Sequence, residues 1–268
     1  MGTTRRSHRE LSKEIALVLK AIEEAMDRAW CELTGPVRPD RDKLAIAAAR
    51  PRALRIRPRL AAWLSPGRKH HFLSTLPAGF SLLDVGCGLN SPYMVKSLFP
   101  DCVYTGIDIG DYRQTKPNLA DRYVLVDPDK FADAIAASGK FDAVVSSHNL
   151  EHRNDRAATL EAMEGAVVQG GMMYLSFPCE ASVRFPSRKG CLNYYDDPTH
   201  VDTPPDFDWV VATLQANGFR IMDSTRRYRP PLWWVIGALA EGWSKRHGRL
   251  LGTWEYYGFE SIIWAEKR

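Results

Sequence analysis

The chain has 268 residues, 45% of them hydrophobic, which is enough apolar material to bury the core of one large domain or of one and a half. Lys and Arg total 36 against 32 Asp and Glu; residues 1–70 hold 16 of the basic and 8 of the acidic residues, and the remainder holds 20 and 24. The five cysteines have irregular spacing, which excludes a disulfide framework and a C-x-x-C metal site.

No apolar run is long enough to cross a bilayer, and the first ten residues, MGTTRRSHRE, are polar and charged, unlike a signal peptide. These features predict a soluble, cytoplasmic protein without a transmembrane segment. The sequence pattern predicts no metal ligands and leaves the oligomeric state open.

An amino-terminal helix is predicted by the capping-box pattern Ser7-x-x-Glu10 and by apolar residues that follow at helical spacing up to Leu33. It is interpreted as a packing helix or as a cap over the active site, and the two are compatible. Residues 37–70 then hold ten Lys or Arg against two Asp. A solvated linker is favoured there over contact with an anionic partner such as RNA, because no aromatic side chains alternate with the arginines.

Residues 82–109 have the pattern of the front half of a nucleotide-binding βαβ unit. A short apolar strand at 82–85 is followed by two glycines at a spacing of two, and a second strand is predicted at 103–107. Asp108 follows 20 positions after Gly88, the distance at which such units place an acid on a ribose hydroxyl pair.

The helix between these strands is predicted to begin with Ser91 as its cap and Pro92 at its first position, and Pro100 ends it. The third glycine of a dinucleotide loop is absent, which weakens an NAD interpretation. Asn90 tolerates positive φ and offers a side-chain amide at this turn.

Asp84, placed before the first glycine, would repel a pyrophosphate and suits a ligand with a cationic amino group and a sulfonium. S-adenosylmethionine is such a ligand.

The pattern Asp84-x-Gly86-x-Gly88, together with Asp108, Asp127 and the later run Ser147-His148-Asn149-Leu150-Glu151-His152, resembles the class I S-adenosylmethionine-dependent methyltransferases of the type 11 group. The resemblance extends from about residue 80 to 178. It implies an α/β fold with a Rossmann-like, seven-stranded, mostly parallel sheet, and it implies that Asp127 accepts from the adenine amino group. An equal alternative for Asp127 is a turn-forming role before Pro128. The expected cofactor-binding residues are Asp84, Gly86, Gly88, Asn90, Asp108, Ile109, Asp127 and Ser147.

The rest of the chain fits an alternation of strands and helices. The predicted strands are 123–126, 141–147, 172–177, 219–223 and 261–265. The predicted helices are 131–137, 157–168 and 207–217. Gly170-Gly171 is interpreted as the turn before the strand at 172–177.

The loop after the strand at 141–147 faces the place where methyl donor and acceptor meet, because ligands of open α/β sheets lie beyond the carboxyl ends of the strands. His148 and His152 could each remove a proton, and Glu151 could orient one of them. For Glu151 and His152 a structural role is favoured, in which they cap the following helix and hold the loop. Cys179 is disfavoured as a nucleophile because no activating partner is evident.

Two insertions are predicted in the domain assigned to residues 71–268, which follows a helical, basic extension at 1–70. The first, near 180–206, contains His200, which is the leading candidate for the general base; a role in helix entry or loop packing is an equal alternative. Asp197 or Asp196 would orient His200, and Tyr194 and Tyr195 would form a wall beside it. The second, near 226–258, is rich in aromatic residues, and its apolar run at 231–240 is interpreted as pocket or core rather than as a membrane contact.

The sequence therefore predicts an S-adenosylmethionine-dependent methyltransferase that O-methylates a small-molecule or glycan-like acceptor, with His200 or His148 as the catalytic base. The alternatives are an RNA methyltransferase and a non-catalytic S-adenosylmethionine-binding protein. A dehydrogenase is a distant third.

Overall fold

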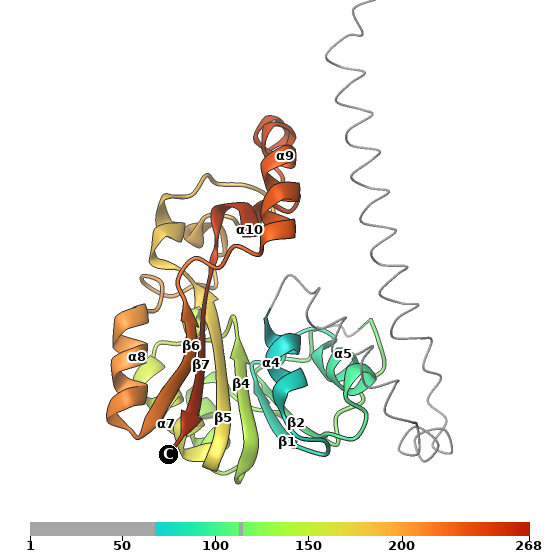
Figure 1. The fold of residues 1–268 in the computed structure, drawn as a ribbon, viewed down its shortest axis with the longest axis vertical. Helices are drawn as coiled ribbons and strands as arrows, with labels where there is room; N and C mark the ends of the chain where they lie inside the picture. Colours follow the sequence, from blue (N-terminus) through green and yellow to red (C-terminus); the bar gives the residue numbers. More distant parts are fainter. Residues whose placement is uncertain (1–67, 113–114) are drawn as a thin grey trace, which may run out of the picture.

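The computed structural model describes residues 68–112 and 115–268. Within this part of the chain, a seven-stranded sheet runs in the order β3-β2-β1-β4-β5-β7-β6, with helices on both faces (Figure 1). The predicted helix up to Leu33 and the basic stretch up to residue 67 lie outside the described residues. The strands are β1 (Ser81–Val85), β2 (Val103–Asp108), β3 (Arg122–Leu125), β4 (Phe141–Ser147), β5 (Val167–Pro178), β6 (Phe219–Thr225) and β7 (Glu260–Lys267).

The strands pair in parallel from β3 to β5, and β7 runs antiparallel between β5 and β6. This confirms the predicted mostly parallel, Rossmann-like sheet. Neighbouring positions of the central strand β1 point to opposite faces, as the two-residue period of a strand requires. Leu82 packs into the cluster on one face, whereas Leu83 and Val85 pack into the cluster on the other.

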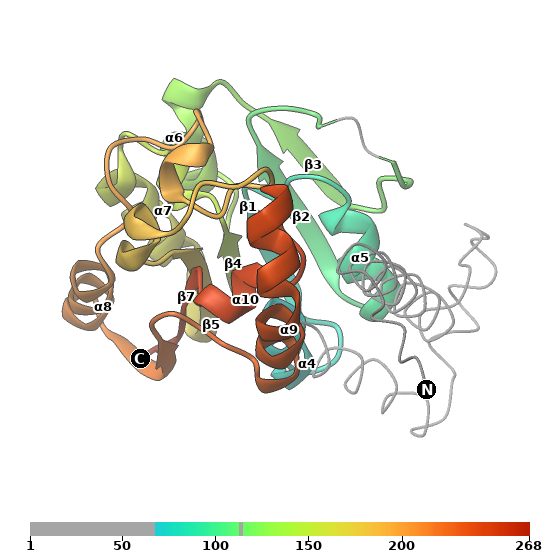
Figure 2. The same ribbon diagram turned by 90° about the horizontal axis from the view of Figure 1, so that it is seen from above.

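Helices from two parts of the chain cover these faces (Figure 2). The Leu82 cluster receives side chains from α4 (Lys69–Thr75) and α5 (Ser91–Leu98). The Leu83 cluster receives side chains from α6 (Phe131–Ala136), α7 (Arg156–Ala166) and α8 (Phe207–Ala216). Both faces of β1 and β4 are therefore buried, as their nearly continuous apolar sequences require.

One predicted turn is wrong. Gly170-Gly171 lies inside β5, which begins directly after α7. The pairing of β4 with β5 shifts between Phe141 and Ala143, and Gly170 has a φ of 76°. The glycines therefore belong to an irregular part of a long strand, where positive φ favours glycine, rather than to a loop.

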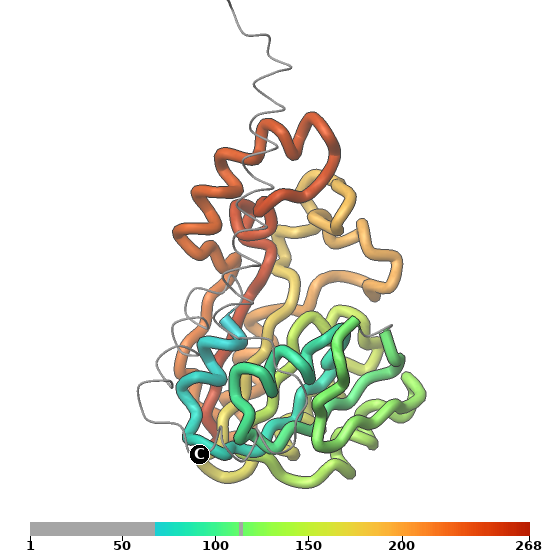
Figure 3. Tube along the Cα trace, turned by 90° about the vertical axis from the view of Figure 1, so that its right-hand side faces the viewer, coloured from blue at the N-terminus to red at the C-terminus, as the bar shows by residue number. Residues whose placement is uncertain are grey.

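The two insertions lie at the same end of the molecule, beyond the carboxyl ends of the parallel strands (Figure 3). The first contains the short helices η4 (Glu180–Arg184) and η5 (Tyr194–Asp196), and the second contains α9 (Pro231–His247) and α10 (Thr253–Tyr257). A β-bridge between Lys189 and Arg249 joins them. Arg188 adds hydrogen bonds of 2.7 and 2.6 Å to the carboxylate of Glu241.

The apolar run at 231–240 forms the first half of α9, and only one side of it is buried. Gly237 and Ala240 face inward, where a Cβ atom on Gly237 would lie 2.1 Å from the carbonyl oxygen of Gly252. Leu232 and Leu239 are more than half exposed. The core interpretation therefore holds for one side of this helix. No helix within the described residues is long and apolar enough to cross a membrane.

Candidate active site

The loop after β1 turns through three residues with positive φ. Gly86 has a φ of 70°, Gly88 of 58° and Asn90 of 60°, so the predicted left-handed turn at Asn90 is confirmed. The Asn90 amide oxygen accepts from the N–H groups of Thr115 and Lys116 at 3.1 and 3.0 Å, and its nitrogen donates to Thr115 Oγ1. The loop is thereby fastened to the segment that follows β2.

Asp108, the last residue of β2, joins that strand to the glycine loop. Its Oδ2 accepts the N–H of Gly88 at 2.6 Å, and its Oδ1 accepts the N–H of Ile109 at 2.7 Å. Burial raises the pKa of Asp108, and the two N–H groups act in the opposite direction. The N–H of Gly110 and the side chain of Tyr112 also interact with this carboxylate, so a ligand hydroxyl would share it with groups of the protein.

Asp84 is fully buried, and its Oδ2 is shared by three side chains of the protein. Lys69 Nζ, Ser91 Oγ and Tyr104 Oη donate to this atom at 2.8, 2.6 and 2.7 Å. The Asp84 charge is thus matched by Lys69, while its Oδ1 has no hydrogen-bond partner among the described residues. The predicted role of Ser91 as a helix cap is wrong, because Asn90 is the residue before the helix and the Ser91 hydroxyl binds Asp84.

The other residues expected around a cofactor lie at the ends of β2, β3 and β4. Ile109 is 42% exposed, directly after Asp108. Asp127 is exposed at the start of η2 (Pro128–Lys130) and makes no capping hydrogen bond. Ser147 Oγ lies 2.9 Å from Ser176 Oγ, which joins the ends of β4 and β5.

His148 lies between two carboxylates. Its Nδ1 is 3.0 Å from Glu151 Oε1, and its Nε2 is 3.3 Å from Glu260 Oε1, so both ring nitrogens act as donors. Burial alone would lower the pKa of His148, but the hydrogen bonds and charges of Glu151 and Glu260 outweigh it and raise the pKa to about 10. Sequence reasoning missed Glu260, because it comes from β7, far along the chain.

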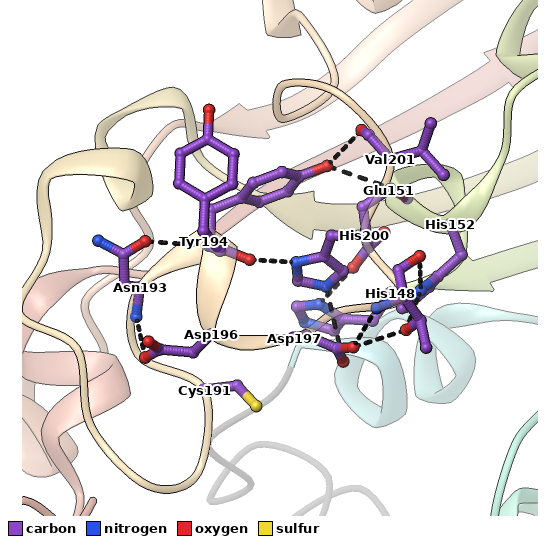
Figure 4. A network of polar contacts seen from close by, with 12 residues as sticks. His148, Glu151, His152, Cys191, Asn193, Tyr194, Asp196, Asp197, His200 and Val201 are labelled. Carbon is purple, nitrogen blue, oxygen red and sulfur yellow. Dashed lines mark hydrogen bonds and ion pairs between the residues drawn. The ribbon is translucent and has the colours of Figure 1, made fainter.

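His200 is held by the first insertion (Figure 4). Its Nδ1 lies 2.6 Å from the carbonyl oxygen of Tyr194, and its ring stacks on the Tyr194 ring with centroids 4.4 Å apart. Asp197 Oδ2 lies 3.9 Å from His200 Nε2. Asp196 instead accepts from Asn193 in a capping box, so of the two acids only Asp197 lies beside His200. Tyr195 is 61% exposed and contacts the ring of Tyr194.

Glu151 and His152 attach the end of β4 to the first insertion. The N–H of Val201 donates to the Glu151 carbonyl at 2.9 Å, and His152 Nδ1 lies 3.2 Å from the carbonyl oxygen of Thr199. These contacts agree with the expected loop-holding role. The expected capping role is wrong, because both residues lie in the short helix η3 (Leu150–His152) and α7 begins later, after Asp155.

Cys179 has the environment of an unreactive thiol. It is fully buried, its Sγ donates to the Gly258 carbonyl at 3.2 Å, and burial raises the pKa of the thiol. A thiolate nucleophile requires the opposite shift.

The strand order, with β7 antiparallel, the glycine loop after β1 and the acid at the end of β2, defines a class I S-adenosylmethionine-dependent methyltransferase. Residues 48–224 match a family model described as a methyltransferase domain. The chain therefore belongs to the methyltransferase domain family.

Solved structures show the same fold. One is an S-adenosylmethionine-dependent methyltransferase from Mesorhizobium loti, 15% identical, with a TM-score of 0.50 over 74% of this chain and 96% of that chain. Another is a methyltransferase from Haloferax volcanii solved with the Trm112 methyltransferase activator, 17% identical, with a TM-score of 0.52 over 86% of this chain and 98% of that chain. Comparison with curated proteins finds no match.

Proposed function

We propose that this S-adenosylmethionine-dependent methyltransferase methylates a hydroxyl group of a small-molecule or glycan-like acceptor. The observation that carries this proposal is the hydrogen bonding of the His200 ring. Because its Nδ1 donates to the Tyr194 carbonyl, a neutral His200 carries its lone pair on Nε2, which is the atom that Asp197 faces. An oriented proton acceptor serves a hydroxyl, which must lose a proton when it is methylated.

The residues at the glycine loop fit the cofactor. Gly86 and Gly88 keep Cβ atoms away from the surface where the ligand approaches, and the Asp108 carboxylate can accept from the ribose hydroxyls. We assign the partly exposed Ile109 to one wall of the adenine ring and the exposed Asp127 carboxylate to its amino group. Asp84 acts on the cofactor indirectly, since it is buried and already paired with Lys69.

When bound, S-adenosylmethionine supplies an electrophilic methyl carbon, whose bond to sulfur breaks with the electron pair staying on sulfur. The acceptor oxygen forms the new bond with an electron pair of its own, and its proton passes to His200 Nε2. Asp197 then stabilises the imidazolium. General-base catalysis of this kind contributes about 100- to 10,000-fold to the rate.

His148 has a different role in this proposal. Both of its ring nitrogens donate to carboxylates, so neither offers a lone pair to an acceptor hydroxyl. We assign His148 to positioning Glu151 and to holding the loop after β4 against β7, rather than to proton transfer.

The experiment is methyl transfer from labelled S-adenosylmethionine to separated cell fractions of small polar molecules, glycans and RNA. We expect a new methoxy group in one of the first two fractions, identified by mass spectrometry and NMR. Label in RNA would favour the RNA alternative, for which the basic residues 37–70 are the supporting observation. Label on nitrogen would contradict the proposal.

A matched pair of variants tests the base. We expect His200→Ala to lower kcat by about 100-fold or more while the affinity for S-adenosylmethionine stays unchanged. His247→Ala, at an exposed position of α9, is the control and should retain full activity. Equal kcat values for the two variants would exclude His200 as the base.

A further inference from the structure

We propose that Glu151, His152 and His200 form a binding site for one divalent transition-metal ion. Each side chain offers one ligand atom, and the three atoms all lie within 4.8 Å of one another. Some point therefore lies within about 2.8 Å of all three, whereas Zn²⁺ takes nitrogen and oxygen ligands at about 2.0–2.2 Å. A shift of about 0.7 Å by each side chain closes the site.

The two imidazoles are oriented as metal ligands generally are. The His200 Nδ1–H donates to the Tyr194 carbonyl at 2.6 Å. His152 Nδ1 lies 3.2 Å from the Thr199 carbonyl oxygen and 3.0 Å from Thr199 Oγ1. The Thr199 hydroxyl donates to Asp197, so it accepts from His152, which makes Nδ1 the protonated nitrogen there too. Both Nε2 atoms therefore carry lone pairs, and metal-binding histidines typically donate their other N–H in this way.

The buried carboxylate of Glu151 is a second, independent observation that favours a bound cation at this site. The residue is fully buried, its Oε1 pairs with His148 at 3.0 Å, and its Oε2 is buried without a hydrogen-bond partner among the described residues. A buried carboxylate oxygen without a partner has lost its hydration without compensation, which destabilises the folded protein. An ion bound between Glu151 and the two histidines would satisfy it.

The ligand set indicates the class of ion. Two imidazoles and one carboxylate suit Zn²⁺, Mn²⁺, Fe²⁺ or Co²⁺, whereas Ca²⁺ and Mg²⁺ prefer oxygen ligands. Asp197, 3.9 Å from His200 Nε2, adds a second carboxylate at the edge of the site. Three protein ligands leave coordination positions open for a substrate oxygen.

The catalytic part of this inference rests on the proposed function. With the ion bound, the His200 lone pair is directed to the ion, so in this form of the enzyme His200 holds the ion and does not accept the proton. An acceptor hydroxyl at an open position would have a lowered pKa. The hydroxyl then releases its proton to water before its oxygen forms the bond to the methyl carbon. The three residues come from two segments far apart in sequence, which is why the sequence pattern predicts no metal ligands here.

The test is metal binding by the full chain after treatment with a chelator, without S-adenosylmethionine. Mn²⁺ is titrated and its free fraction followed by electron paramagnetic resonance, and Co²⁺ is followed by its visible spectrum. We expect one ion per chain, with His152→Ala and His200→Ala each weakening the affinity by about tenfold or more. His247→Ala is the matched control and should bind like the wild type.

Absence of saturable binding, or equal affinity in the His152→Ala/His200→Ala double variant, would overturn the metal site. Glu151→Gln is a third variant; if it does not fold, the two histidine variants decide, because His152 and His200 are less deeply buried than Glu151. Binding without methylation of any hydroxyl supports the metal site and contradicts the proposed acceptor. If chelator-treated protein that binds no ion methylates a hydroxyl at full rate, the result supports the proposed acceptor and contradicts the metal site.

Discussion

Gly86 lies directly against the side chain of Asn149. A Cβ atom on Gly86 would stand 2.7 Å from Asn149 Cβ, Cγ and Oδ1, which no real packing tolerates. Gly86 belongs to the loop after β1, and Asn149 belongs to the loop after β4 that also carries Glu151 and His152. The contact therefore joins the loop assigned to the cofactor to the loop assigned to the acceptor.

The variant Gly86→Ala should disturb both loops. Alanine at a φ of 70° is unfavourable by about 1–2 kcal/mol, and the contact with Asn149 adds to this. We expect a fall in Tm of about 4–8 °C, measured by thermal unfolding, and a loss of affinity for S-adenosylmethionine of about tenfold or more, measured by calorimetry.

Two further variants separate the effect of backbone strain at Gly86 from the effect of its contact with Asn149. Gly165→Ala, on α7 with open space around it, is the control and should leave the affinity unchanged and not lower Tm, because alanine is more favourable than glycine in a helix. Asn149→Gly in the Gly86→Ala background removes the close contact while leaving the backbone strain. If this double variant binds S-adenosylmethionine no better than Gly86→Ala alone, contact between the two loops is not what limits binding.

The second prediction concerns Lys69 and Asp84. Asp84 is fully buried and the Lys69 side chain is 16% exposed, so removing the cation leaves a buried carboxylate without its charge partner. We expect Lys69→Met to lower the free energy of unfolding by about 3–5 kcal/mol, measured by urea denaturation. The double variant Lys69→Met/Asp84→Asn should recover part of the loss, because it buries no unpaired charge.

The exposed pair of Arg220 and Glu266 provides the comparison. Their side chains are 45% and 29% exposed, and exposed ion pairs contribute about 0–1 kcal/mol. Arg220→Met should therefore change stability little. A similar loss for Arg220→Met and Lys69→Met would mean that the burial of Asp84 does not govern the energy of its pair.

The features that the sequence predicts well are set by residues close to one another in the chain. The positive φ of Asn90 and the position of Asp108 follow from local turn chemistry and from the length of one βαβ unit, and both are found in the structure. The α/β class and the mostly parallel sheet, which the family resemblance implies, are also found in the structure.

The predictions that failed depend on contacts between distant segments. Ser91 has the chemistry of a helix cap, but the buried Asp84 offers its hydroxyl a charged acceptor. The positioning role proposed for His148 also depends on a distant segment, because Glu260 comes from β7 and lies 3.3 Å from the second ring nitrogen of His148. In each case the side chain type is informative, and the partner that decides its role comes from another part of the chain.

The third prediction concerns Cys179. Because the thiol is buried, donates to the Gly258 carbonyl and has a raised pKa, alkylating reagents should leave it unmodified in the folded protein. Mass spectrometry after brief treatment with iodoacetamide checks this, with the partly exposed Cys191 as the internal comparison. Cys179→Ser keeps a donor for the Gly258 carbonyl and should retain methyl transfer. Loss of activity without loss of folding would restore Cys179 as a candidate nucleophile.

The fourth prediction concerns Asp108. Its carboxylate is assigned to the ribose hydroxyls, which donate to it most strongly when it is ionised. Asp108→Asn should weaken S-adenosylmethionine binding by about tenfold or more, since a hydrogen bond to a charged group contributes about 1.5–3 kcal/mol. Glu161→Gln, at an exposed position of α7, is a control of the same chemistry.

The pH dependence of binding and of stability should have opposite signs at this residue. Burial raises the pKa of Asp108 in the folded protein, so protonated Asp108 is favoured by folding. Its contribution to stability is full below the unfolded pKa of about 3.9 and is lost as the pH rises through the folded pKa.

Binding requires the ionised form of Asp108, so the affinity of the wild type for S-adenosylmethionine should fall on acidification, at a pH above the pKa of an ordinary aspartate. Calorimetry between pH 4 and about 7 should show this fall in the wild type and a flatter profile in Asp108→Asn. Parallel profiles in the two proteins would show that another group governs the pH dependence of binding.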